Sequence, residues 1–104
     1  MSRRIDDAAT DALTGYLRTH FKGTSWYPSI TGTTAIGRTL TVDTNVTSYD
    51  YDPNTGRSLA SEVCSGASAY ARTVDHGSSS HWFVQVMSRD GTPLVRRHDI
   101  RRRC

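Results

Sequence analysis

Hydrophobic residues recur at helical spacing in two segments of the chain. In residues 5–22 the apolar side chains fall on one stripe with steps of three and four residues. Asp6 and Asp7 lie near the start of this stripe and Gly23 follows its end, in the order that favours a helix. The same period returns from residue 59 to residue 74. The pattern therefore predicts two amphipathic helices.

Alternating patterns predict a β-hairpin after each helix. Residues 26–36 are rich in Thr and in aromatic and β-branched residues, and residues 39–46 alternate between apolar and polar positions. After the second helix, residues 81–87 and 93–97 flank Asp90-Gly91, which is a strong hairpin signal. The alternation leaves one sheet face polar, as antiparallel sheets allow.

This order, α-β-β-α-β-β, predicts an α+β fold in one small domain spanning residues 1–104. We expect a two-layer sandwich, in which a four-stranded, mostly antiparallel sheet carries both helices on one face. Phe83 and Met87 would then point away from the helices, as a tentative surface for a protein partner or for self-association. The residues expected to face the helices are Leu40, Val42, Val46, Trp82, Val84 and Val86.

The positive charge of the chain is concentrated near its C-terminus. The 104 residues carry 13 Lys and Arg against 10 Asp and Glu. Without residues 96–104 the body is slightly acidic, so these residues are interpreted as a basic C-terminal tail. The tail would either bind nucleic-acid phosphates or only keep the chain soluble. Its arginines, the tentative nucleic-acid-binding residues, are Arg96, Arg97, Arg101, Arg102 and Arg103.

Composition also suggests where the chain works. No stretch approaches the ~18 apolar residues of a membrane span, and the N-terminus is polar where a signal peptide would be apolar. We therefore expect a soluble, cytoplasmic protein without membrane contact. Arg outnumbers Lys 12 to 1, which suggests a high-GC bacterium or phage. Cys64 is expected to be a buried thiol, and Cys104 a reduced, unpaired one, with a cross-link between chains under oxidation as the alternative.

The turn at residues 50–56 offers a weak metal candidate. Asp50, Asp52 and Asn54 place oxygen ligands at alternate positions, as in a calcium loop. The register differs from an EF-hand, because Gly56 and Glu62 each come one position late. The alternative interpretation is an Asx-rich turn between a strand and a helix.

The same segment resembles a stretch near the end of Rhs/YD-repeat proteins. The resemblance rests on residues 51–57 with Leu59 and Ser61, and it covers about eleven of the 104 residues. No further YD repeat follows, and we carry no function across from that family.

Catalytic motifs are not recognisable in the sequence. His76 and His81 flank a glycine–serine loop, but neither a zinc ligand set nor a serine triad is complete there. We therefore expect a non-enzymatic binding module without a cofactor, acting through protein–protein contacts or self-association. The alternatives are a nucleic-acid-associated protein that uses the arginine tail, and calcium binding at residues 50–56.

Overall fold

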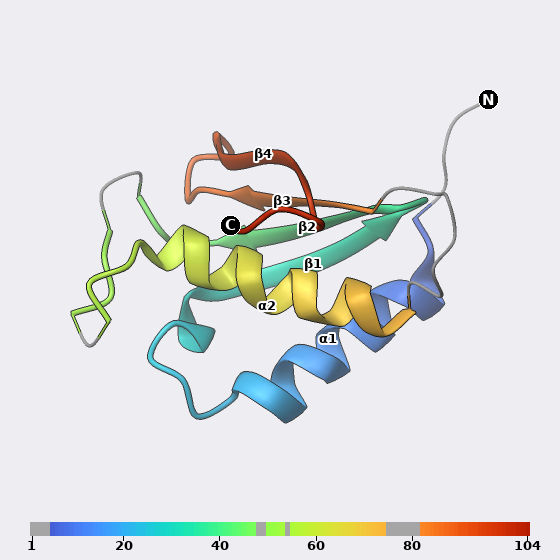
Figure 1. Cartoon of the computed structure of the whole chain (residues 1–104), viewed down its shortest axis with the longest axis horizontal. Coiled ribbons are helices and arrows are strands. Elements are labelled where there is room, and N and C mark those ends of the chain that lie inside the picture. The colour runs from blue at the N-terminus through green and yellow to red at the C-terminus, as the bar shows by residue number, and fades with distance from the viewer. Residues whose placement is uncertain (1–4, 48–49, 54, 75–81) are drawn as a thin grey trace.

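The computed structural model describes residues 5–47, 50–53, 55–74 and 82–104. It confirms the α+β fold with the expected order α-β-β-α-β-β, and Figure 1 shows both helices on one face of the sheet. Neither described helix is both long enough and apolar enough to cross a membrane. The elements are α1 (Asp7–Phe21), a 3₁₀ turn (Tyr27–Ser29), β1 (Ile30–Ile36), β2 (Thr39–Thr44), α2 (Leu59–Val74), β3 (Phe83–Met87) and β4 (Pro93–Asp99).

The sheet is mostly antiparallel, and its strands lie in the order β1-β2-β3-β4. The hairpin partners β1 and β2 run antiparallel, as do β3 and β4. The two central strands are parallel, with Leu40 opposite Val84 and Val42 opposite Val86. A parallel pair needs a long crossover connection, and α2 supplies it. The two hairpins are therefore joined into one sheet by the second helix.

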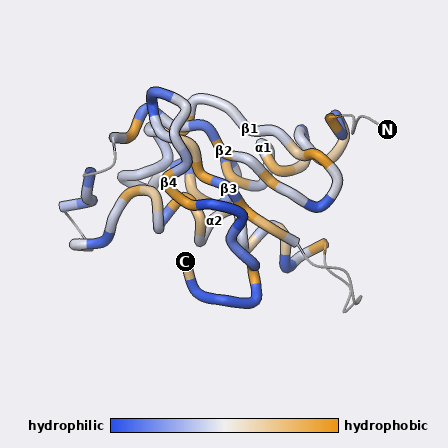
Figure 2. The backbone as a smooth tube through the Cα atoms, turned by 90° about the horizontal axis from the view of Figure 1, so that it is seen from above, coloured by the Kyte–Doolittle hydropathy of each residue, from blue (hydrophilic) through white to orange (hydrophobic). Residues whose placement is uncertain are grey.

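The core lies between the helices and the inner face of the sheet. The predicted inner residues Leu40, Val42, Val84 and Val86 are completely buried, and Val46 is 2% exposed. Trp82 is only partly buried against this core. Figure 2 shows the hydrophobic stretches of β3 and α2 lying in the interior, whereas the segment after β4 is strongly hydrophilic. Other core residues are Leu13, Leu17, Trp26, Ala35, Val63, Cys64, Ala67, Tyr70, Ala71 and Ile100.

The first strand starts later than the sequence pattern predicts. Residues 26–36 were expected to be extended, but the 3₁₀ turn occupies Tyr27–Ser29 and β1 begins at Ile30. Pro28 explains the difference, because proline has no N–H for a strand ladder and its fixed φ suits the first turn of a helix. The turn anchors the end of the α1–β1 connection on the core through Trp26.

The C-terminal segment is part of the fold, which corrects two expectations. Strand β4 continues to Asp99, and Ile100 is 3% exposed, so residues 96–104 do not form a free tail. Cys64 and Cys104 form a disulfide with an S–S distance of 2.06 Å, so the expectation of two free thiols was wrong. After β4 the chain turns back over α2 and brings together two cysteines that are 40 residues apart in sequence.

Candidate functional site

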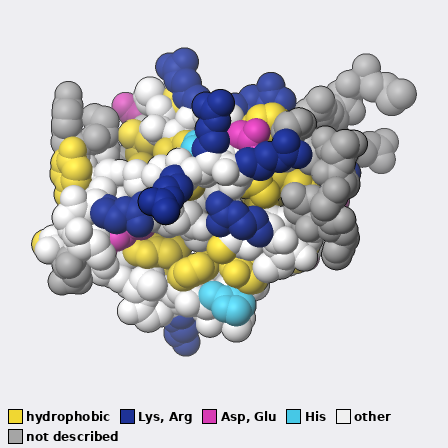
Figure 3. Space-filling view, viewed as in Figure 1, with side chains coloured by type: hydrophobic (Ala, Val, Ile, Leu, Met, Phe, Trp, Pro, Cys, Tyr) yellow, Lys and Arg dark blue, Asp and Glu magenta, His cyan; other side chains and the backbone are white. Residues whose placement is uncertain are grey.

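Figure 3 shows several basic side chains on the face that carries α2 and the C-terminal segment. A cavity of about 350 Å³ opens there beside the disulfide. We call it the arginine pocket, and it is lined by Arg57, Ser65, Arg72, Arg103 and Cys104. The lining thus combines three cations with a hydroxyl group, and its described members include no acidic residue.

Each arginine reaches the pocket from a different part of the chain. Arg57 ends a tight turn, in which its carbonyl accepts a hydrogen bond of 2.8 Å from the Asp52 amide and Gly56 adopts a φ of 71°. Arg72 lies in the last turn of α2, and its Nη2 donates to the carbonyl of Ile100 at 2.8 Å. Arg103 precedes the disulfide-bonded Cys104. The turn, the helix and the disulfide together position the three guanidinium groups.

Three guanidinium groups around one cavity favour an anionic ligand. A guanidinium remains charged at every physiological pH, and its planar fork of donors matches the oxygens of a phosphate or carboxylate. The Nη2 of Arg72 is already bonded to the Ile100 carbonyl, so this group is held in place before a ligand arrives. The arginine pocket can therefore bind a phosphate group through several charge-assisted hydrogen bonds.

A second cavity of about 350 Å³ lies next to the arginine pocket along α2 and shares Arg57 and Ser65 with it. We call it the aromatic pocket. Its wall combines apolar and aromatic side chains with a few polar groups, as ligand pockets commonly do. The remaining lining residues are Phe21, Thr24, Trp26, Glu62, Gly66 and Ala69.

Two buried carboxyl groups interact at the aromatic pocket, Glu62 in its lining and Asp52 outside it. Asp52 is 1% exposed and accepts a hydrogen bond from the Ser25 hydroxyl, and Glu62 is 6% exposed and accepts one from Thr55. The Oε2 of Glu62 is buried without a hydrogen-bond partner among the described residues. Burial raises the pKa of Glu62, the Thr55 bond lowers it, and Asp52 raises it again. The two carboxyl groups therefore lie in surroundings that disfavour a second negative charge on Glu62.

The predicted arginine tail is divided between two faces of the molecule. Only Arg103 lines the arginine pocket. Arg97 belongs to β4, and its guanidinium carbon lies 4.5 Å from the centre of the Phe83 ring, on the sheet face away from the helices. The other three are exposed, Arg96 on β4 and Arg101 and Arg102 in the C-terminal segment.

Sequence reasoning missed two members of the arginine pocket, Arg57 and Arg72. They are isolated single arginines in the sequence, one in a turn and one in a helix. Nothing in their spacing relates them to Arg103. The approach of the C-terminal segment to α2, which the disulfide accompanies, is what brings the three together.

Phe83 and Met87 lie on the open face of the sheet, as expected from the alternation of β3. Their burial alternates with that of Val84 and Val86, and both are half-buried. Gln85 lies on the same face, and its Nε2 is 3.5 Å from the hydroxyl of Thr41 on β2. No described helix covers this face (Figure 1). The structure therefore leaves an apolar and polar sheet surface accessible.

The two predicted calcium ligands that the structure describes, Asp50 and Asp52, have different hydrogen-bond partners. Asp50 accepts hydrogen bonds of 2.8 Å from the amide and the hydroxyl of Thr47, which lower its pKa. Asp52 is instead buried against Ser25, and Asn54 lies outside the described residues. His76 and His81 also lie outside the described residues.

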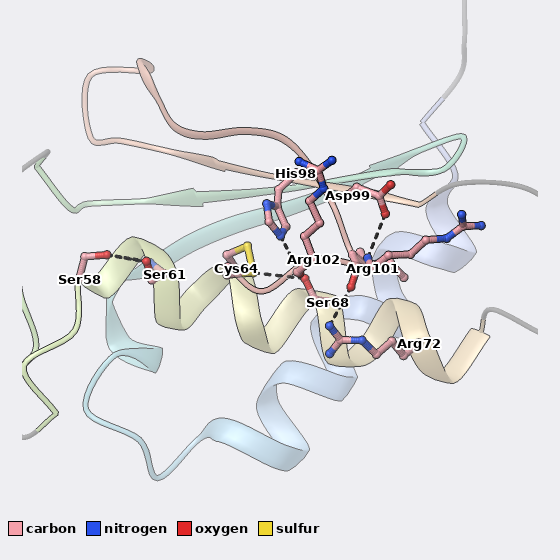
Figure 4. The surroundings of a disulfide bond; sticks show 11 residues. Ser58, Ser61, Cys64, Ser68, Arg72, His98, Asp99, Arg101 and Arg102 are labelled. Carbon is pink, nitrogen blue, oxygen red and sulfur yellow. Dashed lines mark hydrogen bonds between the residues drawn. A yellow bond between two sulfur atoms is a disulfide. The ribbon is translucent and has the colours of Figure 1, made fainter.

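A different group of metal-ligand residues does converge. Among the described residues, one set of three potential ligands has atoms within 4.8 Å of one another, namely Cys64, His98 and Cys104. Figure 4 shows the His98 ring next to the disulfide, between β4 and α2. Sequence spacing does not predict this group. Cys64 lies 40 residues before Cys104, and the two meet only because the C-terminal segment returns over α2.

Comparison of the chain with protein-family models, with curated proteins and with solved structures gave no match.

Proposed function

We propose that the chain is a non-catalytic binding module that takes the phosphate groups of nucleic acid on the face formed by α2 and the C-terminal segment. The observation that carries this proposal is the arginine pocket, where Arg57, Arg72 and Arg103 surround one cavity of about 350 Å³. Neutralisation of phosphates by such groups releases counterions, which supplies much of the affinity of nucleic-acid-binding proteins.

The aromatic pocket favours single-stranded nucleic acid over a simple anion. It adjoins the arginine pocket through Arg57 and Ser65. A phosphate could therefore bind in the arginine pocket while the neighbouring base of the same nucleotide binds in the aromatic pocket. Phe21, which is only half-buried, offers aromatic surface to a base, and the half-buried Thr24 offers a polar group to its edge. Bases become available for such contacts only when they are unstacked, as in single strands and loops.

Fluorescence anisotropy with labelled single-stranded DNA and RNA, over a range of salt concentrations, tests this proposal. We expect affinity to fall steeply with salt for the wild-type chain. Arg103→Gln and Arg57→Gln should each weaken binding of all sequences. Each should also reduce the slope of log affinity against log salt concentration by about 1. Arg18→Gln, an exposed arginine on α1 outside both pockets, is the matched control and should bind as wild type.

Point substitutions are preferable here to removal of residues 101–104, because that truncation would also remove the disulfide-bonded Cys104. Binding that ignores salt, or that responds equally to Arg18→Gln and Arg103→Gln, would contradict the proposal. Equal loss in both variants would indicate a general charge effect instead of a site at the arginine pocket.

Self-association through the open sheet face is the second candidate. It is favoured by Phe83 and Met87, which stay half-buried on a face without a covering helix among the described elements. Sedimentation velocity over a concentration series should then show a dimer that Phe83→Ser abolishes. Tyr51→Ser, which changes a 63% exposed aromatic residue elsewhere, should leave the dimer intact. A wild-type chain that stays monomeric at high concentration would rule this candidate out.

Calcium binding at residues 50–56 and an origin in a high-GC bacterium or phage stay predictions from the sequence. The cytoplasmic location also stays a prediction, and the Cys64–Cys104 disulfide weighs against it. Cytosolic reductants keep most protein thiols reduced, whereas oxidising compartments preserve disulfides. Alkylation of free thiols at the moment of cell lysis would show which state the chain occupies.

A further inference from the structure

We propose that the chain binds a zinc ion through Cys64, His98 and Cys104 when its disulfide is reduced. The candidate ligand atoms of these residues already lie within 4.8 Å of one another. Zinc–sulfur and zinc–nitrogen bonds of about 2.3 and 2.0 Å place tetrahedral ligands about 3.5–3.8 Å apart. Small side-chain movements would therefore complete the site.

The three ligands come from elements that the fold holds against one another. Cys64 is completely buried on α2, and His98 lies on β4, where it pairs with Val84 of the central strand β3. Cys104 follows Ile100, which is buried in the core and whose carbonyl accepts a hydrogen bond from Arg72, so the C-terminal segment has contacts with the core besides the disulfide. Reduction therefore frees the two sulfur atoms while leaving the elements that carry them in contact.

Hydrogen bonds around the three ligands suit a metal site. The Nε2 of His98 is 2.9 Å from the carbonyl oxygen of Arg102. A carbonyl oxygen only accepts, so Nε2 carries the proton of the neutral ring and Nδ1 has the lone pair that a metal needs. Metal-binding histidines usually donate their other N–H in this way. The hydroxyl of Ser68 lies 3.5 Å from the Cys104 sulfur and can donate to a thiolate.

The surrounding arginines do not oppose this site. Arg57, Arg72 and Arg103 line a pocket together with Cys104, and positive charge near a cysteine suits the thiolate that a metal requires. A Zn²⁺ ion bound by two thiolates and a neutral imidazole carries no net charge, so it adds no repulsion toward Arg72 or Arg103. With three protein ligands, a water molecule would occupy the fourth position.

Metal binding and disulfide formation exclude each other. A dithiol reductant of the thioredoxin class gives two electrons and two protons, so the S–S bond breaks, two S–H groups form and the reductant becomes a disulfide. Zinc then displaces both S–H protons into the solvent. In the reverse direction, the disulfide form of the same class takes two electrons from the thiolates and two protons from the solvent to become a dithiol, the Cys64–Cys104 bond forms again and Zn²⁺ passes into the solvent.

Cobalt titration tests the proposal, because Co²⁺ occupies zinc sites and its absorption spectrum reports tetrahedral thiolate ligation. The full chain is reduced, freed of reductant under nitrogen and titrated with Co²⁺, followed by competition with Zn²⁺. We expect one Co²⁺ per chain, displacement by Zn²⁺, and no thiolate absorption with the oxidised chain. Cys104→Ser should lose the strong sulfur absorption, and His98→Ala should weaken affinity at least about tenfold.

His20→Ala is the matched control, because His20 lies on α1 away from the cysteines, and it should bind as wild type. Circular dichroism identifies any variant that fails to fold, and for such a variant His98→Gln replaces His98→Ala. A reduced wild-type chain without thiolate–cobalt absorption would overturn the proposal. So would a folded His98 variant with wild-type affinity, because two cysteines alone would then account for the binding.

Discussion

Gly66 is a position where α2 lies close to the aromatic residues Phe21 and Trp26. A Cβ atom at this position would lie 2.7 Å from the Trp26 ring and 3.3 Å from the Phe21 ring. Trp26 is 7% exposed, so its ring has little room to move away. Gly15 on α1, in contrast, has no atom within 4 Å of its potential Cβ. The two helical glycines therefore have different physical roles.

We predict opposite effects of alanine at these two glycines. Gly66→Ala should lower the free energy of unfolding by about 1–3 kcal/mol, because the added methyl group overpacks the Trp26 contact. Gly15→Ala should raise it by up to ~1 kcal/mol, through helix propensity alone. Urea denaturation followed by circular dichroism measures both. Equal stability of the two variants would show that the structure accommodates a Cβ atom at Gly66 without loss of folding free energy.

Glu62 makes the stability of the chain depend on pH. Its folded-state pKa is raised above the ordinary value of 4.5, first of all by burial. The folded chain therefore holds this proton more tightly, and the stability from Glu62 is present at low pH and lost as pH rises through the folded pKa. Relative to wild type, Glu62→Gln should therefore gain stability as pH rises above the ordinary pKa of 4.5.

Asp90 supplies a control, because its pKa is shifted in the opposite direction from that of Glu62. Hydrogen bonds from Ser88 and Thr92 lower its pKa, so its contribution is lost as pH falls through the folded pKa. Asp90→Asn should therefore lose stability relative to wild type near neutral pH and approach wild type in acid. Thermal unfolding over a pH series checks both variants. Parallel pH profiles for wild type and Glu62→Gln would contradict the role of Glu62.

At the scale of the elements, the C-terminal segment is fixed on α2 by several different contacts. Arg72 donates to the Ile100 carbonyl, Ile100 is buried, and the disulfide closes the end of the segment. The arginine pocket exists because of this packing, since Arg103 reaches it from the C-terminal segment. The stability of the fold and the shape of the arginine pocket therefore both depend on the contacts between the C-terminal segment and α2.

Reduction of the disulfide should lower stability substantially without unfolding the chain. The bond joins residues 40 apart, and a loop of this length corresponds to about 3–4 kcal/mol in the chain-entropy treatment. Thermal unfolding with a reductant and a metal chelator should show a lower midpoint. Cys104→Ser should show the same low midpoint with or without reductant. A reduced wild-type chain as stable as the oxidised one would contradict this account.

At the scale of the whole molecule, the two central strands hold the fold together. Strand β2 pairs with β1 and β3, and β3 pairs with β2 and β4, whereas β1 and β4 are the outer strands of the described sheet. The buried residues Leu40, Val42, Val84 and Val86 all lie on the central pair. Local opening should therefore begin at the outer strands and at the segment after β4.

Hydrogen exchange measured by NMR checks this distribution. The amides of Leu40, Val42, Val84 and Val86 should exchange most slowly, because exposing them requires opening of the core. Amides of β4 should exchange faster, since the register of the β3–β4 pair shifts between Val84 and Met87. Uniform protection across all four strands would show that the sheet opens only as a whole.

The sequence alone determined the local structure of this protein. The two helical stripes and the alternation of Leu40 with Val42 and of Val84 with Val86 depend on contacts within single elements, and residue spacing records them. The helices, the four strands, their order along the chain and the buried faces of β2 and β3 were therefore predictable, whereas the order of the strands within the sheet was not. The 3₁₀ turn at Tyr27–Ser29 was the main local exception, and Pro28 is its cause.

Tertiary structure alone decided which distant residues meet. The disulfide, the arginine pocket and the Cys64–His98–Cys104 group all arise where the C-terminal segment returns over α2. Sequence spacing carries no information about contacts between residues 40 positions apart, because their distance is set by packing of the elements between them. Accordingly, Arg103 of the apparent basic tail lines a pocket, and the two cysteines that were expected to be unpaired form a disulfide.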